Sequence, residues 1–261
     1  MATTLVTDGQ ITAIPQYKVT VERRVPSGLE STLGNAGLPR AVIAASKEKP
    51  KGTEGKHVTN KTVLQQHVEF WDEDGDGVIR PFDTFRGFRR LGFNIFICIG
   101  AIFLVHIGFA YVTQSSWIPI LGNPFFKIYV NRIHKGKHGS DSETFDTEGR
   151  FVPEKFEEIF SKYDQDGKGG LSFNDIRRLI YGNANAVDPF GWISAIFEWG
   201  ILFLLCAQNG IVSKEDVRSQ FDGSLFYRVA ERQKERKSRN YSFPVLYKNL
   251  SEDFKNYSKI K

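Results

Sequence analysis

Residues 72–83 read DEDGDGVIRPFD, and residues 91–113, which follow closely, read LGFNIFICIGAIFLVHIGFAYVT. The first stretch alternates acidic side chains around a glycine, which is the spacing of an EF-hand calcium loop. The second stretch contains no charged residue, and its length suits a helix in contact with lipid. Together they predict a mainly α-helical protein in which a calcium-binding loop leads directly into a membrane-inserted segment.

The acidic loop offers oxygen atoms at the positions that an EF-hand uses. Carboxylates at alternate positions point inward, and Gly77 at position 6 permits the sharp turn. Arg80 stands at position 9, where it contributes through water or not at all. Position 12 is an aspartate rather than the usual glutamate, so we expect lower affinity or a shift towards Mg²⁺. The candidate metal ligands are Asp72, Asp74, Asp76, the carbonyl of Val78, and Asp83.

The uncharged segment is long enough to cross a lipid core. As a helix, its 23 residues reach about 34 Å at ~1.5 Å per residue, against a hydrocarbon core of ~30 Å. A soluble chain of this size rarely needs a core helix that is apolar all round, so we expect lipid contact. Pro119 and Pro124 prevent one helix from continuing. We therefore expect residues 91–126 to form an apolar hairpin that enters lipid and returns.

Two later segments repeat the loop pattern in weakened form. Residues 164–175, DQDGKGGLSFND, match several loop positions but place Lys168 at position 5, where a ligand belongs. Residues 205–216 keep only part of the pattern. EF-hands usually occur in pairs, so we expect the second loop to be the partner of the first. We expect this second loop to bind calcium weakly or not at all, and the third to be purely structural.

Composition divides the chain into five parts. Residues 1–56 are rich in Pro, Gly, Ser, Thr and Lys and show no apolar period, which predicts disorder. Helical periodicity begins near residue 57 and returns in the C-terminal half. The predicted parts are a disordered N-terminal arm at 1–56, the EF-hand at 57–90, the lipid-inserted segment at 91–126, a C-terminal helical domain with degenerate EF-hand loops at 127–230, and a basic tail at 231–261.

Charge and motifs narrow the range of partners. The formal net charge of +5 suits an anionic lipid surface at least as well as a nucleic acid. The sequence contains no nucleic-acid-binding motif and no G-x-G-x-x-G fingerprint, so we expect neither a nucleic acid nor a nicotinamide cofactor. Its first residues, MATTLVTDGQITAIPQ, lack the basic and apolar regions of a secretory signal. We therefore expect the protein to face the cytosol.

Histidine is scarce, with five residues in the sequence. His67 precedes the calcium loop on the same predicted helical face as Trp71, and His134 and His138 lie one helical turn apart in NRIHKGKHGSD. A lone histidine is more often a surface or satisfied core residue than a ligand. Spacing alone leaves open whether any of the three binds a metal or haem.

A resemblance to a known family is carried by the motifs HVEFWDEDGDGVIRPFDTFRGFRRLGFNI, NPFFKIYVNRIHKGKHGSDSETFDTEGRFVP, FEEIFSKYD, FGWISAIFEWG and VSKEDVRSQFDGSLF. In these motifs the sequence resembles the caleosins, also called peroxygenases. The resemblance covers roughly residues 58–230, and the long polar N-terminal arm is similar to that of fungal members. It implies a protein of lipid droplets and the endoplasmic reticulum membrane with one calcium-binding EF-hand, whose segment around Pro119 and Pro124 corresponds to the family's proline knot.

The resemblance also implies an activity, because many caleosins are haem enzymes that use fatty-acid hydroperoxides to oxygenate unsaturated fatty acids. It implies haem b and Ca²⁺ as cofactors, and the family's two haem histidines fall on His67 and His138, with His134 as the alternative for the second. If both serve one haem they lie on the same side of the lipid, which favours monotopic insertion. Phospholipid is then a partner, and self-association stays open. Two other functions stay open as well: a non-enzymatic calcium-dependent droplet coat or tether, and a membrane calcium sensor.

Overall fold

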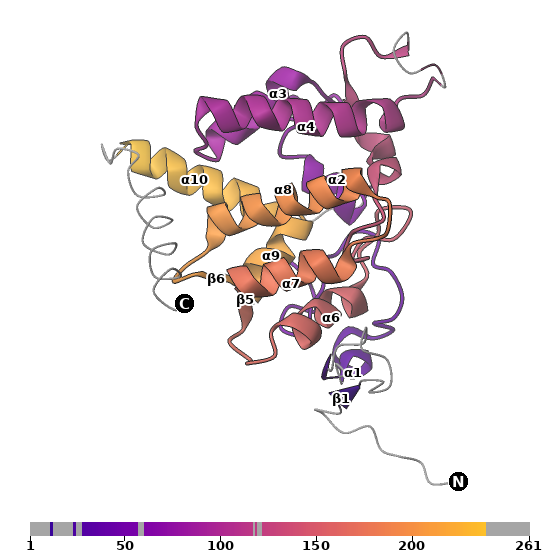
Figure 1. Ribbon diagram of the computed structural model, residues 1–261, viewed down its shortest axis with the longest axis vertical. Helices are drawn as coiled ribbons and strands as arrows, with labels where there is room; N and C mark the ends of the chain where they lie inside the picture. The colour runs from indigo at the N-terminus through magenta and orange to yellow at the C-terminus, as the bar shows by residue number, and fades with distance from the viewer. Residues whose placement is uncertain are drawn as a thin grey trace.

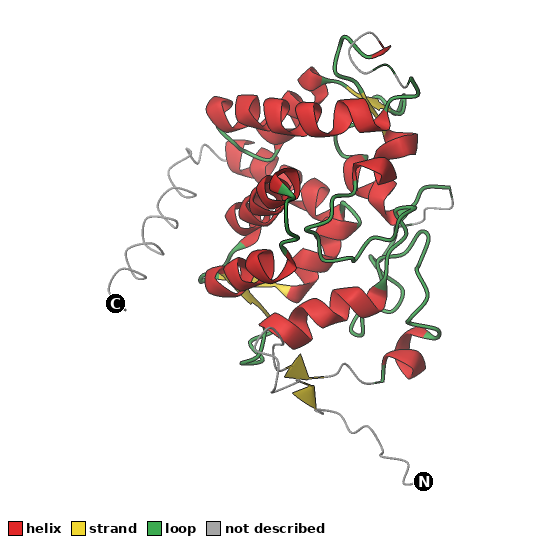
Figure 2. Cartoon of the chain, turned by 45° about the vertical axis from the view of Figure 1, so that its right-hand side comes forward, coloured by secondary structure: helices red, strands yellow, loops and turns green. Residues whose placement is uncertain are grey.

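The computed structural model of the protein describes residues 11–12, 23–24, 28–56, 60–116, 118 and 122–238. Within these residues the chain is mainly helical, as predicted (Figures 1 and 2). Thr62 starts the first helix of the predicted EF-hand with a capping box, and Asn94 caps the start of the long apolar helix. The helices are α1 (Leu29–Leu33), α2 (Val63–Val68), α3 (Pro81–Arg90), α4 (Ile95–Thr113), the 3₁₀-helix η1 (Val130–Gly136), α6 (Pro153–Tyr163), α7 (Phe173–Asn183), α8 (Pro189–Cys206), α9 (Lys214–Phe221) and α10 (Ser224–Ser238).

Short antiparallel strands join the loops between helices in pairs. The strand in the first acidic loop, β3, pairs with β4, which follows the apolar segment. The strand in the second loop, β5, pairs with β6 in the third. The prediction that the first two loops are partners was therefore wrong. The strand that does pair with the first loop, β4, carries none of the acidic spacing by which a partner loop is recognised. The strands are β1 (Ile11–Thr12), β2 (Arg23–Arg24), β3 (Val78–Ile79), β4 (Ile128–Tyr129), β5 (Gly170–Ser172) and β6 (Ile211–Ser213).

Helix α4 is apolar all round in composition but two-sided in burial. Its inner face packs against α3 and η1 and buries small side chains such as Cys98, Ala101 and Ala110. Its outer face leaves Phe96 82% exposed and Phe103 60% exposed. Figure 1 shows α3 and α4 running side by side. The long uncharged stretch therefore forms a helix held on one side by protein.

The polar residue inside this helix has a structural explanation. His106 is buried, with Nε2 2.8 Å from the Thr84 hydroxyl on α3 and Nδ1 2.6 Å from the carbonyl oxygen of Phe126. A buried imidazole with both nitrogens partnered is a satisfied core residue. Its two contacts connect α4 to α3 and to the segment around Phe126 that follows α4. Of the two predicted turn prolines, Pro124 lies in that segment and Pro119 lies outside the described residues.

Part of the predicted disordered arm belongs to the fold, which corrects the boundary at residue 57. Residues 41–53 cross the surface near α6 and α9, and Ala44 joins the main core cluster. The Arg218 side chain, 1% exposed, donates from Nη1 to the Ala44 carbonyl and from Nη2 to the Thr53 hydroxyl, both at 2.8 Å. The Lys47 amide donates to Glu157 at 2.8 Å. Hydrogen bonds to distant residues, rather than an apolar period, order this segment.

Candidate functional site: a histidine-lined cavity beside an acidic loop

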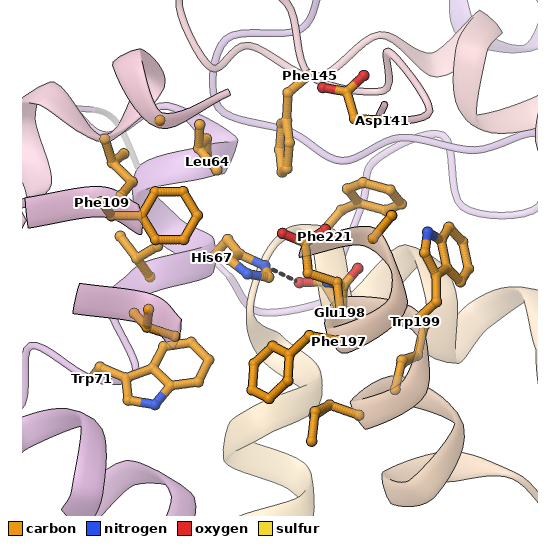
Figure 3. Close-up of a pocket in the computed structure, with 18 of the residues that line it drawn as sticks. Leu64, His67, Trp71, Phe109, Asp141, Phe145, Phe197, Glu198, Trp199 and Phe221 are labelled. Atoms are coloured by element: carbon orange, nitrogen blue, oxygen red, sulfur yellow. Dashed lines mark hydrogen bonds between the residues drawn. The ribbon is translucent and has the colours of Figure 1, made fainter. Parts of the chain in front are cut away.

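A cavity of about 220 Å³ lies between α2, α4, α8 and α9. His67 and His138, which are far apart in the sequence and flank the apolar helix, both line it. Figure 3 shows His67 and Glu198 at this cavity, with phenylalanine and tryptophan side chains around them. The remaining wall is mostly apolar, and its aromatic members include Trp71, Phe109, Phe145, Phe197, Trp199 and Phe221. Such a lining suits a large, flat or long apolar ligand.

His67 presents one nitrogen to the cavity. Its Nδ1 lies 2.8 Å from the backbone carbonyl oxygen of Gln220 on α9. A carbonyl can only accept, so Nδ1 carries the proton and Nε2 keeps its lone pair. Burial lowers the pKa of His67, although the hydrogen bond to Gln220 opposes this. The imidazole is therefore neutral and fixed in the tautomer that a metal-binding histidine needs.

His138 lies beside the Glu198 carboxylate, with 3.8 Å between Nε2 and Oε1. This separation suits an ion pair better than a direct hydrogen bond. Burial lowers the pKa of His138, but Glu198, together with the charges of Asp141 and Asp188, outweighs burial and raises it overall. The Nδ1 atom is buried and has no hydrogen-bond partner among the described residues. His138 thus brings an unsatisfied nitrogen to the same cavity.

The donor set of the cavity fits a haem group. It combines a neutral, oriented imidazole from His67, a second imidazole with an orphaned buried nitrogen from His138, and an apolar aromatic wall. Buried polar atoms without partners are rare and indicate a missing ligand or water. The alternative histidine, His134, lies in η1 and does not line the cavity, so the geometry favours His138 for the second role.

Two groups at the cavity were not predicted from the sequence. Glu198 is the only charged residue within α8, and a single ionisable side chain in an otherwise apolar stretch was a signal that it faces a polar partner. The Gln220 contact uses a backbone carbonyl, which no side-chain pattern reveals. Both come from the C-terminal half, which sequence periodicity described only as helical.

The acidic loop between α2 and α3 brings three predicted metal ligands together. One carboxylate oxygen from each of Asp72, Asp74 and Asp76 lies within 4.8 Å of the others. Asp72 accepts the Gly77 amide at 3.0 Å through Oδ2, while its buried Oδ1 has no partner among the described residues. Burial raises the pKa of Asp72, and the charges of Asp76 and Asp74 add to this. A hard divalent cation would reduce the repulsion between the three carboxylates and would give the Oδ1 atom of Asp72 a partner.

Arginines form hydrogen bonds with three of the predicted ligands, Asp76, Val78 and Asp83. Arg80 donates to Asp76 at 2.6 Å and, more weakly, to the carbonyl of Val78 at 3.4 Å. Asp83 accepts the Arg80 backbone amide at 2.8 Å and the Arg86 guanidinium at 2.7 Å. Hydrogen bonding to Arg80 lowers the pKa of Asp76. A cation in this loop would have to displace Arg80 from Asp76 before all predicted ligands could converge.

In the second loop a lysine stands in the middle of the acidic residues. The Lys168 Nζ lies 3.3 Å from Asp164, 2.5 Å from Asp166 and 2.7 Å from Asp175. Burial works against the charged form of Lys168, but these three carboxylates raise its pKa overall. Its ammonium group therefore supplies the positive charge that a bound metal would supply in an intact loop.

Fold and site define a mainly helical protein with two apolar helices and an aromatic cavity that holds a histidine pair. A family model described as "Caleosin related protein" matches residues 59–230. The chain is 40% identical over 230 residues to a protein of Lilium longiflorum named "Peroxygenase", which covers 88% of this chain and 94% of the relative. It is 36% identical over 184 residues to "Probable peroxygenase 4" of Arabidopsis thaliana, with 68% of this chain and 90% of the relative covered.

A third relative, "Probable inactive peroxygenase-like protein" of Arabidopsis thaliana, is 30% identical over 159 residues, which span 59% of this chain and 73% of the relative. The chain belongs to the caleosin family, as its sequence motifs predicted. The resemblance to fungal members stays a prediction.

Proposed function

We propose that this protein is a calcium-binding haem peroxygenase that acts on lipid surfaces, using fatty-acid hydroperoxides to oxygenate unsaturated fatty acids. The observation that carries the proposal is the position of His67 and His138 on one apolar cavity. Two curated relatives that match most of their length carry the name peroxygenase. An aromatic, largely apolar wall suits both a haem face and an acyl chain.

In this proposal the cavity residues hold haem b and orient its substrates. When bound, haem supplies the redox chemistry that moves one oxygen atom from a hydroperoxide to an alkene. The Nε2 atom of His67 would hold the iron, because the Gln220 carbonyl keeps this nitrogen unprotonated and directs the ring. His138, with Glu198 beside it, would serve either as a second haem-binding histidine or as the group that holds the proton of the hydroperoxide. The aromatic wall excludes water and holds the acyl chains.

The first acidic loop is proposed as the calcium site of an EF-hand, with Asp72, Asp74, Asp76, Val78 and Asp83 as ligands. The second loop, whose carboxylates are neutralised by Lys168, is proposed as calcium-independent. Calcium binding would then affect the cavity through Trp71. This residue precedes the loop, lines the cavity and contacts Gly87 on α3.

We further propose a cytosol-facing, monotopic location on lipid droplets and the endoplasmic reticulum. Two helices, α4 and α8, are long and apolar enough to insert into a membrane. A full span by α4 would separate His67 from His138 by the bilayer thickness, whereas both line one cavity here. Digestion of the C-terminal half by protease added outside sealed microsomes is expected, and its protection would exclude this topology.

A second candidate function is a non-enzymatic calcium-dependent coat or tether of lipid droplets. One observation favours it: a relative of this chain carries the name "Probable inactive peroxygenase-like protein". Membership of the family is therefore compatible with loss of activity. A coat needs no haem and would keep its lipid binding after the cavity histidines are replaced.

The test is the absorption spectrum of the detergent-purified protein after haem supply, for wild type, His67→Ala and His138→Ala. A stoichiometric Soret band in wild type, lost or shifted in the variants, supports the peroxygenase. His134→Ala serves as the matched control, because this histidine lies outside the cavity lining. Absence of the band in haem-supplied wild type would favour the coat protein.

A further inference from the structure

The exposed apolar surface of this protein is concentrated on two helices. Of the twenty large hydrophobic side chains that are exposed in the described part of the chain, ten lie on α4 and α8. Soluble monomers rarely expose a continuous apolar patch larger than a few hundred Å². The outward residues include Phe96, Phe103 and Ile107 on α4, and Trp192, Ile193 and Ile196 on α8.

The two exposed stripes meet where α4 ends and α8 begins. A Cβ atom added to Gly108 would lie 2.5 Å from the Phe190 ring, so the α4 backbone and this side chain are in direct contact. The rings of Phe109 and Phe190 are also neighbours, with centroids 6.0 Å apart. In Figure 1 the two helices lie one above the other. The apolar surface therefore continues from one helix to the other.

The same two helices wall the cavity from their inner sides. Val105 and Phe109 line it from α4, and Phe197 and Ile201 line it from α8. Glu198, the one charged residue of α8, lines the cavity beside His138, and its side chain is 45% exposed. The outward residues Trp192, Ile193 and Ile196 of α8 are themselves uncharged.

Lipid, rather than another protein, fits this surface. Protein interfaces carry about one hydrogen bond per 100–200 Å², whereas a helical face against lipid needs none because its backbone is satisfied internally. A basic segment lies at the border of the face: the side chain of Gln233 on α10 contacts the Gly92 backbone just before α4. Around it, Arg232, Lys234, Arg236 and Lys237 outnumber the acidic Glu231 and Glu235. Such a border complements anionic headgroups.

We propose that α8 lies in the lipid surface together with α4, and that the cavity between them takes its acyl substrate directly from the lipid. The identity of the entering molecule, a fatty-acid hydroperoxide, rests on the proposed function, while the seating of α8 does not. This assigns a lipid contact to the C-terminal half of the chain, in addition to the apolar segment at 91–126.

The test measures flotation of the full-length protein with phosphatidylcholine vesicles that contain a minor fraction of phosphatidylserine. The double variant Ile193→Asn/Ile196→Asn is expected to lower the partition coefficient at least tenfold, since it removes two large side chains from lipid. Tyr181→Asn, 86% exposed on α7 rather than on α4 or α8, is the matched control and is expected to change the partition coefficient less than about twofold. Unchanged melting temperatures of all variants establish that they fold.

Quenching gives an independent readout of the same contact. Trp192 is expected to be quenched by phosphatidylcholine with brominated acyl chains, measured as the difference between wild type and Trp192→Phe. Equal flotation of the double variant and wild type, or no quenching of Trp192, would overturn the proposal. The proposal would also be overturned if the wild type formed a stable dimer while the double variant was monomeric with unchanged flotation. None of these measurements uses turnover, so a failed Soret test leaves them valid.

Discussion

The Nδ1 atom of His67 on α2 lies 2.8 Å from the backbone carbonyl oxygen of Gln220 on α9. Two segments separated by most of the described chain thus determine together which nitrogen of this imidazole faces the cavity. The acceptor is a main-chain atom, so replacing the Gln220 side chain leaves it in place. The orientation of His67 depends on how closely the backbones of α2 and α9 approach.

Gly223 controls this approach, and its substitution is expected to weaken haem binding. Gly223 has φ +75°, and an added Cβ would lie 2.5 Å from the Gln66 carbonyl oxygen and 3.1 Å from the His67 Cα. We expect Gly223→Ala to push α2 away and to lower bound haem several-fold, measured by Soret absorbance per protein. Gly210→Ala is the control: at φ +77° it carries the same left-handed strain of about 1–2 kcal/mol but has no neighbour within 4 Å. Equal effects of both variants would contradict the prediction.

Arg80 is expected to compete with calcium at the proposed site in the first loop. Because its guanidinium lies 2.6 Å from Asp76, an incoming ion must displace it. Arg80→Gln is expected to raise calcium affinity roughly two- to fivefold, the range of a solvent-exposed ion pair. Isothermal titration calorimetry measures the change, with Arg89→Gln as a control outside the loop. A lower affinity in Arg80→Gln would mean that Arg80 supports the site.

Removal of calcium is expected to loosen haem. At the proposed site the ion would fix the angle between α2, which carries His67, and α3, whose Gly87 contacts Trp71 at the cavity. After chelation, with metal loss verified by elemental analysis, we expect a smaller Soret band and lower turnover. An unchanged Soret band together with unchanged turnover would show that the calcium loop does not affect the cavity.

Lys168 is expected to hold the second loop together in place of a metal. Lys168→Met leaves the buried carboxylates of Asp164 and Asp175 without their main cation, which should lower the free energy of unfolding by roughly 1–3 kcal/mol. Lys168→Asn restores a ligand at position 5 and is expected to add a second calcium equivalent in calorimetry. One equivalent in both wild type and Lys168→Asn would show that the loop cannot be reactivated by this change.

The contribution of Lys168 has a defined dependence on pH. Burial alone would raise the pKa of Asp175, but hydrogen bonds from Lys168, Ser172 and Arg178 lower it to about 2. A depressed carboxyl pKa stabilises the fold above the ordinary value of 3.8, and this stabilisation is lost as pH falls towards about 2. We therefore expect the stability difference between wild type and Lys168→Met, measured by urea denaturation, to shrink across this window. A difference that stays constant would exclude Asp175 as its source.

The sequence predicted those features that depend on neighbouring residues. Alternate spacing placed Asp72, Asp74 and Asp76 in one loop, and hydropathy located the helix that became α4. The loop pairing was beyond prediction, because β4 consists of ordinary apolar residues with no recognisable loop around them. Glu198 was visible as an isolated charge, but only the fold brings it to His138.

The order of residues 28–56 was missed for a related reason. This segment has no apolar period, and its contacts are made by single residues to partners far away in the sequence. Arg218 forms several of them at once: besides Ala44 and Thr53, it pairs with Glu215 at 2.7 Å and Asp222 at 3.3 Å. A buried arginine reads in the sequence as an ordinary charged residue of an exposed helix, so its acceptors cannot be inferred from local pattern.

This buried arginine connects the region that the family model matches to residues that precede it. The family match begins at residue 59, after both Ala44 and Thr53. A polypeptide cut at that boundary would keep every residue of the cavity and of the acidic loops. It would, however, lose two of the hydrogen-bond acceptors of the Arg218 side chain. Loss of such partners from a buried charge costs several kcal/mol, a large share of the stability of an ordinary domain. A version of this protein that folds by itself is therefore expected to begin before Ala44, ahead of the region that the family model matches.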